Sequence, residues 1–459
     1  MKIKIKHLGP IRQAEFIPGD LTLICGANNT GKTYATYALF GFLDVWRRML
    51  KIRIENKTIE TLLGNGVVHI DLKNYLNKAG DILQQGCQNY TKILPKIFSA
   101  SEEYFKETQF QVLPDIKTLS VSAAFERKIQ ATNAELFSLS KSENSMDLVV
   151  SLLTDKEKIQ FPTDVLKEII TDVVNEIIFG QFFPKPFIAS AERTGVAIFR
   201  KGLNFARNRL LKEISQDDKN IDPMKLLFNV YQDYALPVES NVDFIRQLET
   251  VAKKRSFIAE NHPDVLNDFS DIIGGKYSVT RNDELYFYPK GKRIRLTMDE
   301  SSSAVRSLLD IRFYLHHVAR QGDLLIVDDP ELNLHPKNQR RIARLFARLV
   351  NLGIKVFITT HSDYIVKELN TLIMLNHDKP HLKQIAQEEG YKENELISDD
   401  KIKVYIAEEA LIKLDGNKRK SRCQTLTAAH IDPELGIEAR SFDTTINRMN
   451  RIQEAVVWG

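Results

Sequence analysis

The chain has 459 residues, of which 43% are hydrophobic and 27% are charged, the balance of an ordinary globular protein with room for two or three domains. Its formal net charge of +4 is too small to indicate a nucleic-acid-binding protein by itself, and its three cysteines are too far apart to form a zinc site or a disulfide framework. Since there is no apolar signal segment and no window approaches 18 apolar residues, we expect a cytoplasmic protein without a membrane span.

The first 25 residues predict a β-hairpin that leads into a buried strand. The stretch "KIKIKHL" alternates apolar and polar residues, Gly9-Pro10 interrupts it, and "RQAEFIP" resumes it. The next stretch, "LTLIC" at residues 21–25, is mostly apolar, as in the interior of a sheet. A helix is predicted to follow over residues 34–46, where apolar residues recur at helical spacing.

Between this strand and this helix lies GANNTGKT, which has the spacing of a phosphate-binding loop. Its backbone N–H groups would surround phosphate oxygens, Lys32 would reach the β- and γ-phosphates, and Thr33 would bind Mg²⁺. The helix N-terminus that follows the loop also favours phosphate. We therefore predict that ATP and Mg²⁺ are bound here by Gly26, Ala27, Asn28, Asn29, Thr30, Gly31, Lys32 and Thr33.

Residues 34 to about 180 are predicted to form a long, mixed insertion. Helices are expected over 71–98 and over 163–179. The second has Val165, Ile169, Val173 and Ile177 at four-residue steps. No heptad repeat continues for several turns, so we expect no long coiled-coil arm.

A strand and a turn are predicted over residues 185–195, "KPFIASAERTG", where Arg193 is interpreted either as a surface residue or as a phosphate ligand. Residues 199–268 are again helical and charged. Residues 276–298 read as two alternating strands around Asn282-Asp283. A helix with Leu308 and Ile311 on one face follows, and the serines at 301–303 can cap its N-terminus, a feature that favours anions.

Two further apolar strands end in polar residues. In "DLLIVDDPELNLHP", residues 323–336, Asp328 would bind Mg²⁺ together with Thr33, and Asp329 would orient or polarise the attacking water. In "IKVFITTHS", residues 354–362, His361 would bind the γ-phosphate or that water.

The order of GANNTGKT, SSSAVRSL, LLIVDDPELNLHP and FITTHSD resembles that in ABC-type ATPases of the branch with SMC-like, RecF-like and overcoming-lysogenization-defect (OLD) heads. The opening "LGPIRQAEF" resembles the first hairpin of that branch. The resemblance covers residues 1–40 and 270–375. It implies an α/β fold: a P-loop ATPase head with an N-terminal β-hairpin, a mostly parallel core sheet flanked by helices, and a large, mainly helical insertion.

The resemblance also implies a homo-oligomer in which two heads enclose two ATP molecules. Ser302 and Ser303 of one chain would then bind the γ-phosphate held by the other, with Asn333 in support. Arg12 is placed near the nucleotide because its hairpin leads directly into the phosphate loop.

Two positions differ from the family pattern. Ala304 replaces a glycine, and Asp329 replaces a glutamate. Because aspartate has one methylene fewer, its carboxylate lies more than an ångström further from the substrate, a displacement that can lower a catalytic rate by about 10²-fold. Glu331 could compensate. We therefore expect slow hydrolysis of ATP to ADP and phosphate, with Asp329, His361 and Glu331 as the catalytic residues.

Four segments are predicted from these assignments. Residues 1–45 and 269–376 would form the two lobes of the head, and 46–268 the insertion, with strands near 187–197 returning to the head. Residues 377–459 would form a C-terminal region that docks a partner.

Stand-alone ATPases of this kind resemble the ATPase subunits of bacterial anti-phage systems such as PARIS and Septu. This resemblance implies an ATP-dependent sensor or switch that responds to a phage protein and controls a separately encoded effector such as a nuclease. The chain itself shows no nuclease motif: Glu408 and Glu409 lack the glycine and the later D-x-D of a TOPRIM domain.

Two alternatives remain. The first is a DNA-repair or chromosome-handling ATPase that binds duplex DNA, to which the basic clusters at 253–255 and 416–423 could contribute, although each also suits a solvated surface. The second is a scaffold in which ATP only locks a dimer. The missing coiled-coil arm argues against the first, and the intact Lys32, Thr33 and Asp328 argue against the second.

Overall fold

The computed structural model describes residues 1–113, 121–131, 134–153, 162–199, 234–280, 284–432, 434–437 and 448–456. The chain divides into two compact units. The insertion unit comprises Met1–Lys4, Phe42–Ile93 and Gln109–Pro184, and the core unit comprises Ile5–Gly41, Leu94–Thr108 and Lys185–Gly459. Along the described part of the chain, no helix combines the length and the apolar character needed to cross a bilayer.

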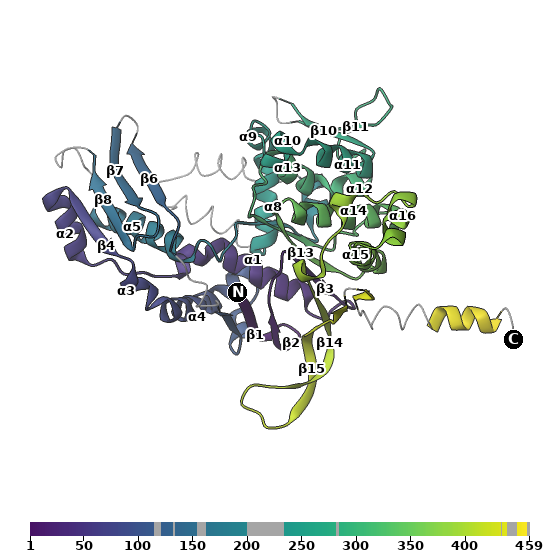
Figure 1. Ribbon diagram of the computed structural model, residues 1–459, viewed down its shortest axis with the longest axis horizontal. Coiled ribbons are helices and arrows are strands. Elements are labelled where there is room, and N and C mark those ends of the chain that lie inside the picture. The colour runs from purple at the N-terminus through teal and green to yellow at the C-terminus, as the bar shows by residue number, and fades with distance from the viewer. Residues whose placement is uncertain are drawn as a thin grey trace, which may run out of the picture. The chain divides into compact units, whose positions relative to one another are not determined.

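The insertion unit contains a four-stranded antiparallel sheet with the strand order β4-β8-β7-β6 (Figure 1). None of these four strands was located from the sequence. The sheet strands and the other elements of this part of the chain are α2 (Asn56–Asn65), β4 (Val67–Asp71), α3 (Lys73–Leu76), α4 (Ala79–Phe98), β5 (Gln109–Leu113), β6 (Phe125–Ala131), β7 (Ala134–Lys141), β8 (Asp147–Leu152) and α5 (Thr163–Phe179).

Helix α5 has the predicted bounds, but of the residues predicted at four-residue steps only Val173 is fully buried. Val165 and Ile169 are only partly buried, whereas Leu166 and Ile170, one position further along, are fully buried. Apolar residues cover more than one side of this helix, so spacing alone did not identify the side that packs inward.

The core unit is built on a six-stranded sheet with the order β15-β14-β3-β13-β12-β9. Neighbouring strands are parallel except for the edge strand β15, which is antiparallel to β14. This sheet, flanked by helices, confirms the predicted α/β class with a mostly parallel core. Its strands are β3 (Leu21–Cys25), β9 (Pro186–Ala189), β12 (Leu324–Asp328), β13 (Lys355–Thr360), β14 (Ile402–Lys413) and β15 (Lys420–Ala428).

The position of β14 was not anticipated. The sequence places residues 377–459 in a separate C-terminal region, whereas β14 pairs in parallel with β3, so that Ile406 lies opposite Cys25. The strand that leads into GANNTGKT therefore has β13 on one side and β14 on the other (Figure 1).

The remaining elements of the core unit include the predicted β1–β2 hairpin at its start and the predicted antiparallel pair β10–β11; the turn at Asn282-Asp283 lies outside the described residues. These elements are β1 (Lys2–Leu8, shared with the insertion unit), β2 (Ile11–Phe16), α1 (Lys32–Met49, also shared), η1 (Glu102–Phe105), α8 (Leu236–Arg246), α9 (Leu248–Val251), α10 (Phe257–Asn261), α11 (Pro263–Ile273), β10 (Gly275–Val279), β11 (Leu285–Pro289), α12 (Ser303–Ser307), α13 (Leu309–His317), α14 (Pro336–Asn351), α15 (Asp363–Met374), α16 (Pro380–Glu388), η4 (Glu393–Glu395), η5 (Asp399–Lys401), β16 (Ile431–Asp432) and β17 (Gly436–Ile437).

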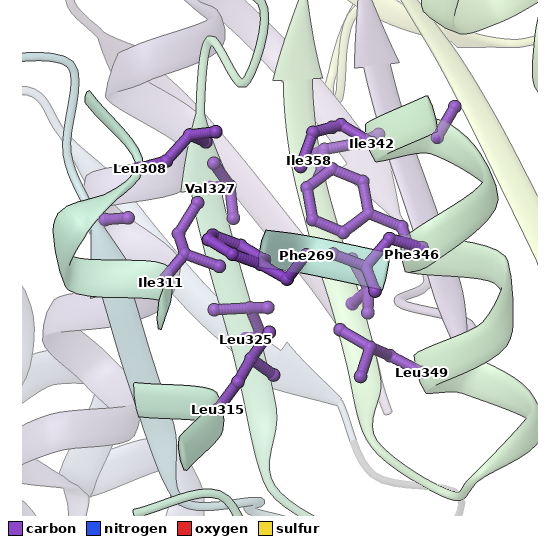
Figure 2. Packing of buried hydrophobic residues seen from close by; sticks show 14 of the residues in the cluster. Phe269, Leu308, Ile311, Leu315, Leu325, Val327, Ile342, Phe346, Leu349 and Ile358 are labelled. Atoms are coloured by element: carbon purple, nitrogen blue, oxygen red, sulfur yellow. The ribbon is translucent and has the colours of Figure 1, made fainter. Parts of the chain in front are cut away.

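One hydrophobic cluster fixes the helices to the sheet (Figure 2). Ile311 and Leu315 of α13 point toward Leu325 of β12, and Phe269 of α11 lies between this group and Phe346 of α14. All five side chains are at most 1% exposed. Because a fully buried side chain of this size contributes about 1.5–3 kcal/mol, this packing holds the strand ends in place.

Candidate functional site

The phosphate loop connects the carboxyl end of β3 to the first residue of α1, as predicted. Gly26 and Gly31 have φ angles of 142° and 94°. A Cβ on Gly26 would lie 2.5 Å from the carbonyl oxygen of Ala407, and one on Gly31 would lie 2.6 Å from Cγ1 of Ile11. Both positions therefore require glycine for their conformation and for space.

Lys32 is buried against the loop that it terminates. Its Nζ donates hydrogen bonds to the carbonyl oxygens of Gly26, at 2.9 Å, and Ala27, at 2.8 Å. These bonds hold the ammonium group over the loop backbone, the same backbone whose N–H groups can surround a phosphate.

Asp328 is the last residue of β12 and is 1% exposed. One carboxylate oxygen, Oδ1, accepts a hydrogen bond from the hydroxyl of Thr359, and Oδ2 is buried without a partner among the described residues. Burial raises the pKa of Asp328 to about 6, and the nearby charge of Asp329 raises it too, whereas the hydrogen bond from Thr359 and the nearby hydroxyl of Thr33 lower it. The structure thus brings together Thr33 and Asp328, the two residues predicted to bind Mg²⁺.

Asp329, Glu331 and His361 form a group that we call the acid–histidine cluster. His361 Nδ1 lies 3.1 Å from Glu331 Oε1 and 3.4 Å from Asp329 Oδ1, and one ligand atom from each of the three residues lies within 4.8 Å of the others. Glu331 is nearly buried, and burial raises its pKa; hydrogen bonds from Thr360 and His361 lower it. The cluster brings together the three residues predicted to be catalytic.

The backbone around Asp329 is held in an unusual conformation. Asp329 has a φ of 49°, in the left-handed region that non-glycine residues rarely adopt. Its N–H donates to the carbonyl oxygen of Thr359, at 3.2 Å, and its own carbonyl oxygen accepts a 2.8 Å hydrogen bond from Arg193. Strain of this kind is common at functional sites and persists only where neighbours enforce it.

Arg193 is fully buried and donates hydrogen bonds to four backbone carbonyl groups. It reaches Ser307, Ser190, Asp328 and Asp329, at distances between 2.6 and 2.8 Å. The surface interpretation of Arg193 is therefore wrong, and carbonyl groups occupy the guanidinium that the other interpretation assigned to a phosphate. Arg193 ties the ends of β9 and β12 to the end of α12.

Helix α12 begins at the predicted serine cap. Ser302 is exposed, and its Oγ accepts a hydrogen bond from the N–H of Val305 at 3.3 Å. Ser303 is half-buried, and its Oγ accepts one from Arg306 at 3.3 Å. Both contacts lie within the same short segment, so the hydroxyl groups of the cap face solvent or their own helix.

Arg12, the other residue predicted to contact the nucleotide, is exposed on β2. Its Nη1 lies 3.0 Å from Nδ1 of His7 on the neighbouring strand β1. This contact lies within the N-terminal hairpin, so its role toward ATP stays a prediction.

A family model described as an AAA ATPase domain matches residues 1–366, most of the chain and all of the site residues described above. The chain belongs to the AAA ATPase domain family. No curated protein is significantly similar to it in sequence. Among solved structures, the SMC head domain from Thermotoga maritima is 10% identical, with a TM-score of 0.30 over 94% of this chain and 98% of that one. An SmcHead bound to the C-winged helix domain of ScpA is 11% identical, with a TM-score of 0.30 over 92% of this chain and 97% of that one.

The residues of this AAA ATPase domain fit a magnesium ion held beside the phosphate loop. Buried carboxylate oxygens of Asp328, Asp329 and Glu331 have no hydrogen-bond partner among the described residues. Mg²⁺ prefers such hard oxygen ligands and is usually held by one or two carboxylates together with phosphate oxygens. Thr33 and Asp328 stay the predicted residues for holding it.

Two contacts of the core unit were missed from the sequence. Glu192 follows β9 and accepts a 2.8 Å hydrogen bond from Tyr37 of α1; the rule that ligands lie at the carboxyl ends of parallel strands, applied to His361, would also have pointed to it. Gln424 of β15 donates to the carbonyl oxygen of Thr30 at 3.1 Å. No local pattern marks Gln424, because β15 reaches the loop only in the folded chain, where it pairs with β14.

Proposed function

We propose that the chain binds Mg²⁺-ATP at the phosphate loop and hydrolyses it slowly, as an ABC-type ATPase of the SMC, RecF and OLD branch. One observation carries the proposal. The phosphate loop and Asp328 lie at the carboxyl ends of parallel strands, where Thr360 pairs with Cys25 and Thr359 with Asp328. This arrangement supports the proposal because the residues predicted to bind ATP and to act in catalysis follow the same ends of the sheet.

Each residue has a distinct part in this proposal. Lys32 exchanges its bonds to loop carbonyl groups for bonds to the β- and γ-phosphates. Magnesium, when bound, would neutralise charge on the phosphate oxygens. Asp329 and Glu331 orient and polarise the attacking water, and His361 lies beside both carboxylates, within reach of the same water.

We also propose that two chains share each ATP. Ser302 is exposed at the start of α12, so that its hydroxyl is accessible to a second chain. The phosphate loop already uses its own N–H groups on the phosphates, which leaves the γ-phosphate to be contacted from the partner's side by Ser302 and Ser303.

A mixing experiment tests the shared site. Lys32→Ala damages the phosphate loop, and Ser303→Arg places a bulky cation at the serine cap. A mixed pair keeps one composite site with both residues intact, so mixing two inactive variants should restore part of the ATPase activity. No recovery at concentrations where the wild-type chain self-associates would indicate hydrolysis within one chain.

The cellular role that we propose is a switch subunit in an anti-phage complex. A phage protein is the trigger, and ATP-dependent pairing of two chains controls a separate effector such as a nuclease. The support is the resemblance to the ATPase subunits of PARIS and Septu systems. Copurification with the products of neighbouring genes, with and without ATP, tests this role. Absence of any ATP-dependent partner would contradict it.

DNA binding is a second candidate because the β14–β15 hairpin ends in a cluster of exposed basic side chains. These are Lys413, Lys418, Arg419, Lys420 and Arg422. If the hairpin contacts DNA phosphates, affinity for duplex DNA should fall steeply with salt, and replacing three of these residues by alanine should flatten that dependence. Equal binding by the triple variant at every salt concentration would exclude the hairpin.

A further inference from the structure

A pocket of the core unit lies between α10, α11, α13 and β10 and has a volume of about 460 Å³. It contains none of the residues of the phosphate loop or of the acid–histidine cluster. Its size falls within the range of about 300–1,000 Å³ that is usual for small-molecule sites. The pocket is therefore large enough for an organic ligand.

The lining of this pocket is basic. Arg255, Lys276, Arg312, His316 and His317 contribute to it, and no carboxylate side chain is among its described lining residues. None of Arg255, Lys276 and Arg312 forms a salt bridge with a described residue. Positive side chains gathered without counter-charges repel one another, and an anion in the pocket would remove that repulsion.

Arg312 is the member of this group with the clearest unmet hydrogen-bonding capacity. Its Nη1 is buried and has no acceptor among the described residues. Burial lowers the pKa of Arg312 to about 10, a value at which the side chain still carries its charge at neutral pH. A buried charged donor without an acceptor destabilises the fold. An anionic oxygen in the pocket would accept a hydrogen bond from Arg312 Nη1 and remove this cost.

The two histidines extend the polar wall. Their rings lie 4.2 Å apart, centre to centre. Burial, followed by the positive charge of Arg312, lowers the pKa of His316 to about 4, and burial also lowers the pKa of His317. Both are therefore neutral at pH 7 in this pocket, where they can donate hydrogen bonds without adding to the repulsion.

The rest of the pocket is apolar. Leu266, Val279 and Phe313 line it together with small alanine residues. A bare phosphate ion would occupy only the charged part and leave these side chains uncovered. A ligand that matches both parts carries an anionic group and an apolar or aromatic group.

We propose that this pocket binds a small organic phosphate of the size of a nucleoside monophosphate. Its phosphate group lies against Arg312, Arg255 and Lys276, and its apolar part lies against Leu266 and Val279. The site is separate from the phosphate loop and does not depend on ATP hydrolysis.

The test is equilibrium binding of AMP, adenosine and inorganic phosphate to the full chain, with the phosphate loop filled by Mg²⁺ and a non-hydrolysable ATP analogue. AMP should bind at one site per chain, with adenosine and inorganic phosphate each at least about 10-fold weaker. AMP binding should persist in Lys32→Ala without the analogue, which separates this site from the phosphate loop. Equal affinity for AMP and inorganic phosphate would overturn the proposed ligand class.

Two variants locate the site. Arg312→Met should weaken AMP binding at least about 10-fold, and Lys276→Met, at an exposed position that tolerates substitution, should weaken it about 3-fold or more. The control is Lys253→Met, an exposed residue paired with Glu249 at 3.3 Å and outside the pocket lining. AMP binding that neither pocket variant changes, or no AMP binding at millimolar concentration, would overturn the proposal. If Arg312→Met does not fold, the AMP affinity of Lys276→Met tests the proposal by itself.

Discussion

The ring nitrogen Nδ1 of His361 lies 3.1 Å from the carboxylate oxygen Oε1 of Glu331. Glu331 is much better enclosed than Asp329, with a side chain 5% exposed against 24%. Glu331 Oε1 also accepts hydrogen bonds of 2.7 Å from the Thr360 hydroxyl and from the His361 N–H. Two acids therefore share one histidine, and the more rigidly held of the two is Glu331.

The first prediction concerns these two acids. Asp329→Asn and Glu331→Gln should each leave ATP affinity nearly unchanged and lower single-turnover hydrolysis by about 10²-fold, because the lost charges polarise water rather than hold nucleotide. Glu260→Gln, at an exposed residue, is the matched control. A wild-type rate for Asp329→Asn would remove Asp329 from the mechanism and leave the task to Glu331.

The second prediction concerns nucleotide binding. Lys32→Ala should lose a charge-assisted phosphate contact of about 1.5–3 kcal/mol, which corresponds to an affinity loss of about 10- to 150-fold. Equilibrium ATP binding measures the loss, with Lys367→Ala, at an exposed position on α15, as the control. Unchanged affinity in Lys32→Ala would contradict the assignment of the phosphate loop.

The third prediction concerns the buried guanidinium. Arg193→Lys should lower the free energy of unfolding by about 3–5 kcal/mol, because a lysine ammonium cannot replace a planar group that spans four carbonyl oxygens. Denaturant unfolding measures the change, and Arg320→Lys, at an exposed position, should stay within about 0.5 kcal/mol of wild type. A similarly small change for Arg193→Lys would mean that the four bonds contribute little.

The fourth prediction concerns pH. Asp310 of α13 is fully buried, neither of its carboxylate oxygens has a hydrogen-bond partner among the described residues, and burial raises its pKa to about 7. The unfolded chain would have a value of about 3.9, so the folded state holds this proton more tightly. The stability that Asp310 contributes is therefore complete below about pH 4 and is lost as the pH rises through 7, by on the order of 4 kcal/mol.

Asp310→Asn should abolish this loss. The variant should be more stable than wild type at pH 8, and the difference should shrink as the pH falls to 5. Urea unfolding at the two pH values measures it, with the exposed Asp299→Asn as the control. An equal effect of Asp310→Asn at both pH values would show that Asp310 does not titrate in this range.

The sequence predicted the motifs that follow single strands and missed the features that depend on pairing between segments far apart in the chain. GANNTGKT, Asp328 and His361 were found because each follows its own apolar strand, and parallel strands bring such ends together. The pairing of β14 with β3 joins segments at opposite ends of the chain, so no window of residues reveals it. Arg193 was misjudged because a charged residue is rarely buried, and its four carbonyl partners come from three separate segments.

The pairing of β3 with β14 also constrains how the protein is made. A ribosome that has just completed GANNTGKT must add about 370 further residues before β14 exists, which takes on the order of 20–80 s at typical rates of elongation. Throughout that time β3 lacks its neighbour β14, and until residues 355–360 are made it also lacks β13, so the backbone groups of an apolar strand are open to other chains. The nascent polypeptide thus carries the phosphate loop beside an unpaired strand for most of its synthesis, and β3 can pair with other chains until β14 is made.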